Sequence, residues 1–268
     1  MNVAHKVKSW FAEGKNAGDS SSDDIQFVGT KSIPQRHAAF FMSSCLAASE
    51  ISTFLRLYLA ALTSADLPQC VGVTREYASV QISILQRKLA STLIECVNLL
   101  ENYMKVCSRK RDDVFPQFLR TTSAVVAQIK ADAGHSYAVE LRNKVVHHFD
   151  FAHITKLLGA AKEERQYTIY LHETDGNCLY PVADHLILAA LFEMDNGEAT
   201  YHAFDDWVRQ TASQLMIIHN TFCINLWEKY FSEKFAESMR LDVPDALIPN
   251  VKEMTLPIMV DTSQLQSS

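Results

Sequence analysis

The sequence predicts a mainly α-helical protein, built as an up-and-down helical bundle of one main domain. The chain of 268 residues contains 8 Gly and 7 Pro, and scarcity of both favours long helices over turn-rich β architecture. Hydrophobic residues make up 48% and charged residues 21%, which is the ordinary balance of a chain that buries a sizeable core. Several stretches of helical length contain neither Gly nor Pro, so the helices are expected to be long.

Residues 1–33 are expected to form an N-terminal arm and a linker. Val3, Val7, Trp10 and Phe11 recur at helical spacing, which indicates a short amphipathic helix. Residues 14–30 are rich in Gly, Asn, Ser and Asp, a composition typical of flexible linkers. The arm either folds back on its own domain or docks on a partner subunit, and the pattern allows both.

The main helical domain is predicted over residues 34–240. A first helix is expected over 36–63, and a second from an N-cap at Thr74 to about Val106. The second has an apolar stripe that advances by three or four residues, formed by Leu85, Leu89, Leu93, Val97, Leu100 and Met104. A third is predicted to begin near Asp112 and Asp113, whose carboxylates suit the positive end of a helix dipole, and to stop before Gly134. A fourth is expected from Ser136.

An insertion at about residues 160–200 is predicted to contain a small β-hairpin. Residues 167–172 alternate in polarity, residues 174–177 have turn chemistry, and residues 178–182 follow as the second strand. Residues 184–194 fit a strand or a short helix equally well. A last long helix is predicted over 204–238, with Asp205 and Asp206 charging its start, and residues 241–268 are expected to form an extended, partly disordered tail.

Cysteine use and charge restrict the class of protein. The six cysteines form no CxxC pair and are expected to be small core residues in a reducing compartment, so a cytoplasmic location is predicted. No secretion signal is visible, and apolar stretches such as 186–192 are much shorter than the roughly 20 residues that span a bilayer, so no membrane partner is expected. A net charge of −6 argues against a protein that coats nucleic acid, although a local basic patch remains compatible with binding it.

The most informative stretch is residues 142–148, Arg-Asn-Lys-Val-Val-His-His. In a helix, Asn143 and His147 lie on one face, and the long side chain of Arg142 reaches the same region. A histidine can take or give a proton near neutral pH, and an arginine binds two phosphate oxygens without losing its charge. These residues could therefore cleave RNA by activating the ribose 2′-OH towards the adjacent phosphate. This chemistry requires no metal and no cofactor.

The motif Arg142-Asn143-x3-His147 resembles the R-x(4 to 6)-H signature of the HEPN superfamily, which has a polar residue after the arginine. The resemblance covers about residues 36–151, with the predicted helix over 204–238 as a further part of the domain. It implies a HEPN-like helical bundle that forms a homodimer with a composite active site, and metal-independent endoribonuclease activity. Within the resemblance, Arg142 binds the phosphate, Asn143 positions and His147 is the acid or base. It also implies a toxin, stress or phage-defence role, with an antitoxin or regulatory protein as a partner.

Other interpretations of the same residues stay open. His148 also satisfies the signature, so either imidazole could be catalytic, and exposed Arg and His on helices are common without any catalytic part. His147 and His148, with Asp150 and His153, also allow a metal site, but a zinc site usually draws its ligands from separate segments, so no metal is predicted.

A basic cluster at the end of the second helix is the other candidate RNA-binding feature. It comprises Lys105, Arg109, Lys110 and Arg111, and Lys144 of the motif is added to it as a phosphate contact. The same cations also suit the negative end of a helix dipole, and the sequence does not separate the two roles.

P-loop, GxGxxG, GxSxG and HExxH motifs are absent from the sequence. The sequence therefore predicts a metal-independent endoribonuclease, with a non-catalytic HEPN-like module that binds nucleotide, RNA or a protein as the alternative.

Overall fold

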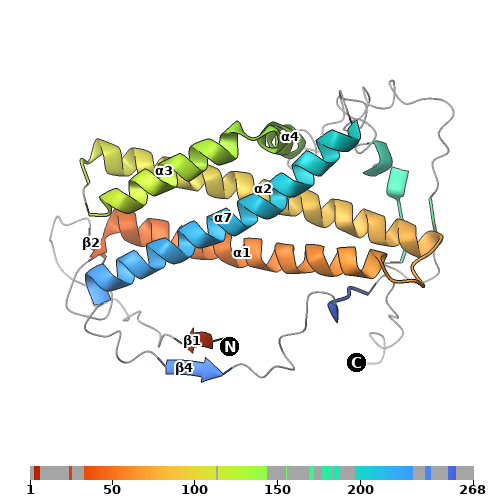
Figure 1. The fold of residues 1–268 in the computed structure, drawn as a ribbon, viewed down its shortest axis with the longest axis horizontal. Coiled ribbons are helices and arrows are strands. Elements are labelled where there is room, and N and C mark those ends of the chain that lie inside the picture. Colours follow the sequence, from red (N-terminus) through yellow and green to blue (C-terminus); the bar gives the residue numbers. More distant parts are fainter. Residues whose placement is uncertain are drawn as a thin grey trace. The chain divides into compact units, whose positions relative to one another are not determined.

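The fold is given by a computed structural model that describes residues 3–6, 24–25, 33–112, 114–143, 155, 169–171, 177–182, 184–186, 197–231, 239–242 and 253–257. Most of these residues lie in α1 (Gln35–Ala65), α2 (Val73–Arg109), α3 (Pro116–Ala131), α4 (Ala133–Leu141) and α7 (Gly197–Phe231), shown in Figure 1. The strands are β1 (Val3–Lys6), β2 (Asp24–Ile25), β3 (Ile33–Pro34) and β4 (Met239–Asp242). The prediction of a mainly α-helical protein is confirmed.

The chain divides into two compact units, and the three longest helices contribute residues to both. Unit 1 comprises Met1–Ser49, Glu95–Gln128 and Ser213–Pro249. Unit 2 comprises Glu50–Ile94, Ile129–Ala212 and Asn250–Ser268. The catalytic motif predicted from the sequence belongs to unit 2, and the predicted basic cluster belongs to unit 1.

The core of unit 1 is aromatic. Phe222 of α7 is fully buried, and its ring contacts the rings of Phe40, Tyr103, Phe115 and Phe118 at centroid distances of 4.6, 5.6, 5.7 and 5.3 Å. Most of these contacts are edge-to-face, the geometry that the ring quadrupoles favour. α1, α2, α3 and α7 therefore meet around one side chain in this unit.

The core of unit 2 combines aliphatic side chains with a second, smaller cluster. Ala61, Leu89, Leu93 and Val208 are buried at 0% exposure. A separate cluster of Tyr77, Val80 and Leu179, with Tyr170 against it, attaches the insertion to α2. The hydroxyl of Tyr77 donates a hydrogen bond to the carbonyl of Asn177, which reinforces this attachment.

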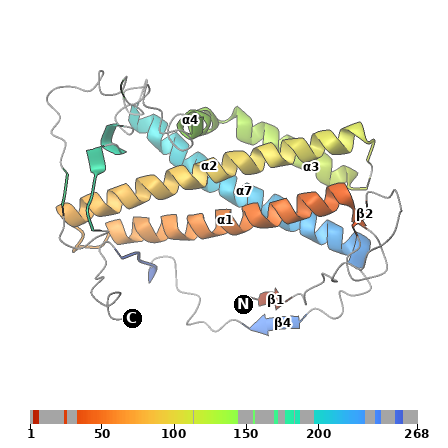
Figure 2. The same ribbon diagram turned by 180° about the vertical axis from the view of Figure 1, so that it is seen from behind.

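The N-terminal arm is not helical where it is described, so the prediction of an amphipathic helix is wrong for residues 3–6. β1 pairs antiparallel with β4, with Val3 opposite Asp242 and Lys6 opposite Met239 (Figure 2). β2 pairs antiparallel with β3. A strand gains its backbone hydrogen bonds from a partner, and the partner of β1 is more than 230 residues away, so local periodicity could not reveal it.

Two predicted helix starts are also corrected. α2 is capped by Gly72, whose carbonyl accepts from the backbone N–H groups of Arg75 and Glu76 and whose φ is 56°. The hydroxyl of Thr74 instead bonds the backbone of Val71 at 3.0 and 2.8 Å. α3 begins at Pro116 rather than near Asp112, because proline suits a first helical position while the Asp112 carboxylate is engaged by Arg36.

The insertion and the tail follow the predictions in part. Tyr170 and Leu179 form an antiparallel bridge with N···O distances of 2.9 and 2.8 Å, as a hairpin requires, but residues 181–182 of the expected second strand are helical. Residues 184–186 are helical, which is one of the two alternatives left open for residues 184–194. Residues 254–257 of the tail have no regular secondary structure and are held in place by hydrogen bonds to α1 and α2. Leu256 donates to the Ser64 hydroxyl at 2.7 Å, and Gln81 donates to the carbonyl of Pro257 at 2.9 Å.

One of the described helices, α1, is long and apolar enough to cross a bilayer by length and composition. The prediction from the sequence concerned uninterrupted apolar runs, whereas Ser and Thr residues and the charged Glu50 and Arg56 interrupt the apolar residues of α1. The core helix of a soluble protein passes the same test, and α1 buries Phe40, Ile51 and Tyr58.

Candidate functional site

The predicted motif begins at the end of α4. Arg142 follows the last residue of α4 with φ −57° and ψ −49°, and its backbone N–H donates to the carbonyls of Ala138 and Val139, so the backbone is still helical there. The side chain of Arg142 is half-buried and that of Asn143 is exposed. Nη1 of Arg142 donates to Oδ1 of Asn143 at 3.2 Å. The exposed amide of Asn143 is therefore one partner of the Arg142 guanidinium.

The rest of the motif, Lys144, His147 and His148, lies outside the described residues. The convergence of Arg142, Asn143 and His147 on one point is therefore still a prediction. The alternative metal site at His147, His148, Asp150 and His153 lies outside the described residues as well.

α4 is fixed in unit 2 by its first residues, which differ from the prediction. Gly134 was predicted to stop the preceding helix, but it is the second residue of α4, and the chain breaks between helices at Asp132. The Asp132 carboxylate accepts from the Gly134 N–H at 2.8 Å and so caps α4. Gly134 is buried against α7, where a Cβ atom on it would lie 2.3 Å from Cβ of Trp207. Trp207 in turn donates from Nε1 to the carbonyl of Ile129 at 3.2 Å, which holds the end of α3.

Substitution Gly134→Ala is expected to destabilise the protein by about 1–3 kcal/mol, because the new methyl group cannot occupy the space that Trp207 and the Ala203 carbonyl fill. The better helix propensity of alanine, about 1 kcal/mol, offsets only part of this cost. Urea denaturation measures the change in the free energy of unfolding. Gly72→Asn is the matched control, since nothing lies within 4 Å of a Cβ there and asparagine tolerates positive φ. Equal stability of wild type and Gly134→Ala would contradict the close packing.

The predicted basic cluster is exposed. Lys105, Arg109, Lys110 and Arg111 all lie at the surface, the first two in the last turns of α2 and the others in the turn that follows. Arg109 occupies the last turn of α2, where a cation is favoured by the helix dipole. Exposure and position fit both phosphate binding and helix capping, so the choice between these roles stays open.

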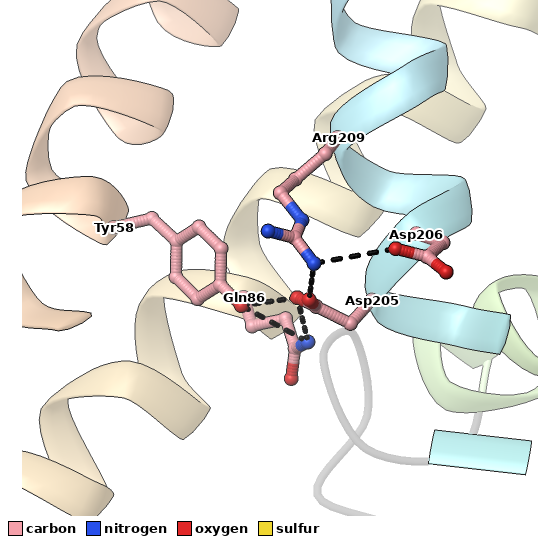
Figure 3. Close-up of polar contacts among 5 residues, drawn as sticks. All are labelled: Tyr58, Gln86, Asp205, Asp206 and Arg209. Atoms are coloured by element: carbon pink, nitrogen blue, oxygen red, sulfur yellow. Dashed lines mark hydrogen bonds and ion pairs between the residues drawn. The ribbon is translucent and has the colours of Figure 1, made fainter. Parts of the chain in front are cut away.

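Sequence reasoning missed a buried polar network in unit 2 that joins α1, α2 and α7 (Figure 3). Asp205 of α7 accepts hydrogen bonds from the hydroxyl of Tyr58 and, at 3.1 Å, from Nε2 of Gln86. The guanidinium of Arg209, one turn along α7, forms an ion pair with Asp205 and also contacts Asp206 at 3.3 Å. Burial and the bond to Asp205 raise the pKa of Tyr58 far above its usual value, so the phenol stays protonated as a donor.

The prediction that Asp205 and Asp206 charge a helix start is therefore wrong. α7 begins at Gly197, so both residues lie about two turns inside the helix. Asp205 shares a helix face with Val208 and Ala212, both 0% exposed, and a carboxylate on such an apolar face was the signal that could have revealed the network. Because its donors come from α1 and α2, Asp205 joins these two helices to α7.

A groove of about 340 Å³ lies in unit 1 between α3 and α7. It is lined by Gln117, Phe118, Thr121, Thr122, Val125, Gln214, Ile217, Ile218, Thr221 and Asn225. None of these residues carries a charge, so the groove is poorly suited to hold a phosphodiester.

One group in unit 1 has metal-ligand chemistry. Atoms of His37, Cys107 and Asp112 that can ligate a metal all lie within 4.8 Å of one another. No spacing pattern in the sequence indicates this group, because His37 is 70 residues from Cys107 and the three side chains meet only through the packing of α1 against the end of α2.

Comparison of the chain with protein-family models, with curated proteins and with solved structures found no match.

Proposed function

We propose that the protein is a HEPN-type, metal-independent endoribonuclease. The proposal is supported chiefly by the pairing of Arg142 with Asn143 at the end of a helix that Asp132 caps and Trp207 holds in place. This pairing gives the cation of the signature a defined orientation next to the segment that carries the two histidines. The mainly helical architecture is compatible with a HEPN-like bundle.

In this proposal His147 removes the proton from a ribose 2′-OH, and the 2′-oxygen attacks the adjacent phosphorus. The bond from phosphorus to the 5′-oxygen breaks, and this oxygen takes a proton from a second acid, for which His148 or a histidine of a second copy is available. Arg142 stabilises the charge on the phosphate oxygens in the transition state, and Asn143 positions the guanidinium. The products are a 2′,3′-cyclic phosphate and a 5′-hydroxyl end.

The cellular setting is part of the same proposal. A homodimer would bring two Arg-His sets into one cleft. Free cysteines favour a reducing environment, which suits the cytoplasm. The resemblance favours a toxin or phage-defence role, with an antitoxin as partner.

An RNA-binding module without catalysis is the second candidate. The four exposed cations at Lys105, Arg109, Lys110 and Arg111 favour it, since they would bind a phosphate backbone without any histidine.

The test is cleavage of total RNA by the purified full chain in EDTA, with the ends of the products analysed. Arg142→Ala and His147→Ala are each expected to lower the rate about 100-fold or more, since general acid-base catalysis contributes about 100-fold to 10,000-fold. His148→Ala decides which imidazole is catalytic. Arg56→Ala is the matched control, because Arg56 is an exposed arginine of the same unit. Circular dichroism of each sample verifies that the variants, and the protein in EDTA, remain folded.

Each outcome separates the two candidates. Cyclic phosphate ends that depend on Arg142 and on one histidine support the nuclease. Cleavage that is equal in all variants would belong to a contaminant or another site. RNA binding without cleavage, weakened by Arg109→Ala and Lys110→Ala but not by His147→Ala, supports the binding module.

A further inference from the structure

His37, Cys107 and Asp112 form a buried group in unit 1. His37 lies in the first turn of α1, Cys107 in the last turn of α2, and Asp112 in the turn between α2 and α3. The side chains of His37 and Asp112 are each 1% exposed, and Cys107 is 0% exposed. All three residue types are zinc ligands in proteins when the thiol and the carboxyl have lost their protons.

The imidazole of His37 is held by one nitrogen only. Nδ1 lies 2.8 Å from the hydroxyl of Tyr103, and either group can be the donor, according to the tautomer of the ring. In the tautomer in which Nδ1–H donates to the hydroxyl oxygen, Nε2 carries a lone pair. A histidine that binds a metal through Nε2 usually donates its other N–H in this way.

Nε2 of His37 has no hydrogen-bond partner among the described residues. Oδ2 of Asp112 lies only 3.1 Å away, but it is not placed where the ring N–H would point. Two atoms that carry lone pairs repel each other at this distance unless a positive charge lies close to both, and the guanidinium of Arg36, which contacts Oδ2, supplies one such charge. A buried polar nitrogen without a partner also loses its hydration without compensation, so such atoms are rare unless something unseen satisfies them.

We propose that Nε2 of His37, the sulfur of Cys107 and the carboxylate of Asp112 bind one zinc ion that stabilises unit 1. The carboxylate is oriented as a ligand would be, because Arg36 donates to Oδ2 and the backbone N–H of Val114 donates to Oδ1 at 3.0 Å. A carboxylate has about four lone-pair positions, so the contact with Arg36 leaves room for an ion.

Binding requires the loss of a proton. Without an ion, burial raises the pKa of the Cys107 thiol, so the sulfur carries its proton at neutral pH. Zinc forms a bond to sulfur as this proton is released to solvent, and the thiolate and the carboxylate then balance the charge of the ion. Ligand atoms of a tetrahedral zinc site lie about 3.3–3.8 Å apart for bonds of about 2.0–2.3 Å, so the group closes by up to about 1 Å around the ion.

The ion would have a structural role. Three protein ligands leave one position, which a water molecule fills, but the burial of His37 and Asp112 keeps a substrate from reaching it. The ion would join the start of α1 to the end of α2 next to the aromatic core, where His37 also contacts the ring of Phe115 at 5.1 Å. This inference is independent of the proposed ribonuclease activity, whose residues belong to the other unit.

The experiment measures the metal content of the full chain, purified without chelator, by elemental mass spectrometry. One zinc ion per chain is expected for the wild type and for Cys96→Ser, a buried cysteine of the same helix that is not part of the group. Cys107→Ser and His37→Ala are expected to lose the ion. Cobalt-loaded wild type is expected to show the near-ultraviolet charge-transfer band of a thiolate ligand and the intense visible bands of tetrahedral cobalt, and Cys107→Ser to lack that charge-transfer band.

Several results would overturn the inference. A folded wild type that contains no zinc and gives no thiolate band with cobalt shows that a proton on Nε2, shared with Asp112, satisfies the group instead. Zinc that persists in folded Cys107→Ser would lie elsewhere. If the variants fail to fold, the cobalt spectrum of the wild type decides alone, because the thiolate band is its direct signature.

Discussion

Phe222→Ala is expected to destabilise the protein by about 3–5 kcal/mol, the range for removing a fully buried phenylalanine side chain. The ring is 0% exposed and contacts Phe40, Tyr103, Phe115 and Phe118, so its loss leaves a cavity lined by rings from α1, α2 and the α3 region. These rings are attached to three different elements, and collapse into the cavity would require the helices to move.

The measurement is the midpoint and slope of urea denaturation, followed by circular dichroism. Ile224→Ala is the matched control, since Ile224 lies on the same helix two residues away and is 53% exposed, so its loss is expected to change the free energy of unfolding by about 0.5 kcal/mol or less. If Phe222→Ala is as stable as Ile224→Ala, then Phe222 is not the centre of the unit 1 core.

The second large effect is expected for Asp205→Ala, which removes the acceptor shared by two buried donors. Tyr58 and Gln86 are 1% and 3% exposed, so neither can turn to water when the carboxylate is lost. Each unsatisfied buried donor costs about 1–3 kcal/mol, and the expected destabilisation is therefore about 2–5 kcal/mol. Arg209 contributes little, because its side chain is 48% exposed and stays solvated.

Two further variants separate the causes. Asp206→Ala removes the neighbouring carboxylate, which is 62% exposed, and is expected to cost about 0.5 kcal/mol or less. Asp205→Asn keeps an oxygen that accepts from Tyr58 and Gln86 but removes the charge, and is expected to recover most of the stability lost in Asp205→Ala. If Asp205→Asn is as unstable as Asp205→Ala, then charge rather than hydrogen bonding holds the network.

Local patterns predicted most of the helical structure. The expected helices over 36–63 and from 74 to about 106 correspond to α1 and α2, whose observed ends differ by only a few residues. The stripe from Leu85 to Met104 was expected to be a core face, and Leu89, Leu93, Val97 and Leu100 are buried. Helical periodicity is a property of consecutive residues, so it is readable without knowledge of the partner helix.

The errors arose where a distant residue decides the conformation. Glycine commonly ends a helix, so Gly134 was expected to end one. Gly134 instead lies inside α4, where the contact with Trp207 leaves no room for a side chain. The apolar residues of the N-terminal arm recur at helical spacing. Residues 3–6 nevertheless form a strand, because β4 provides the partners for their backbone hydrogen bonds. Asp112 was assigned to a helix start because its charge suits one, yet Arg36 engages its carboxylate across 76 residues of sequence.

The candidate site shows the same division. The sequence by itself determined the helical class and the order of Arg142, Asn143, His147 and His148 along the chain, because these depend on residue types at short spacing. Only the tertiary structure decided that Asp205 joins three helices, and that His37, Cys107 and Asp112 meet in one buried group. Contacts between residues far apart in sequence form when helices pack, and packing depends on the shapes of both surfaces, which no single stretch of sequence contains.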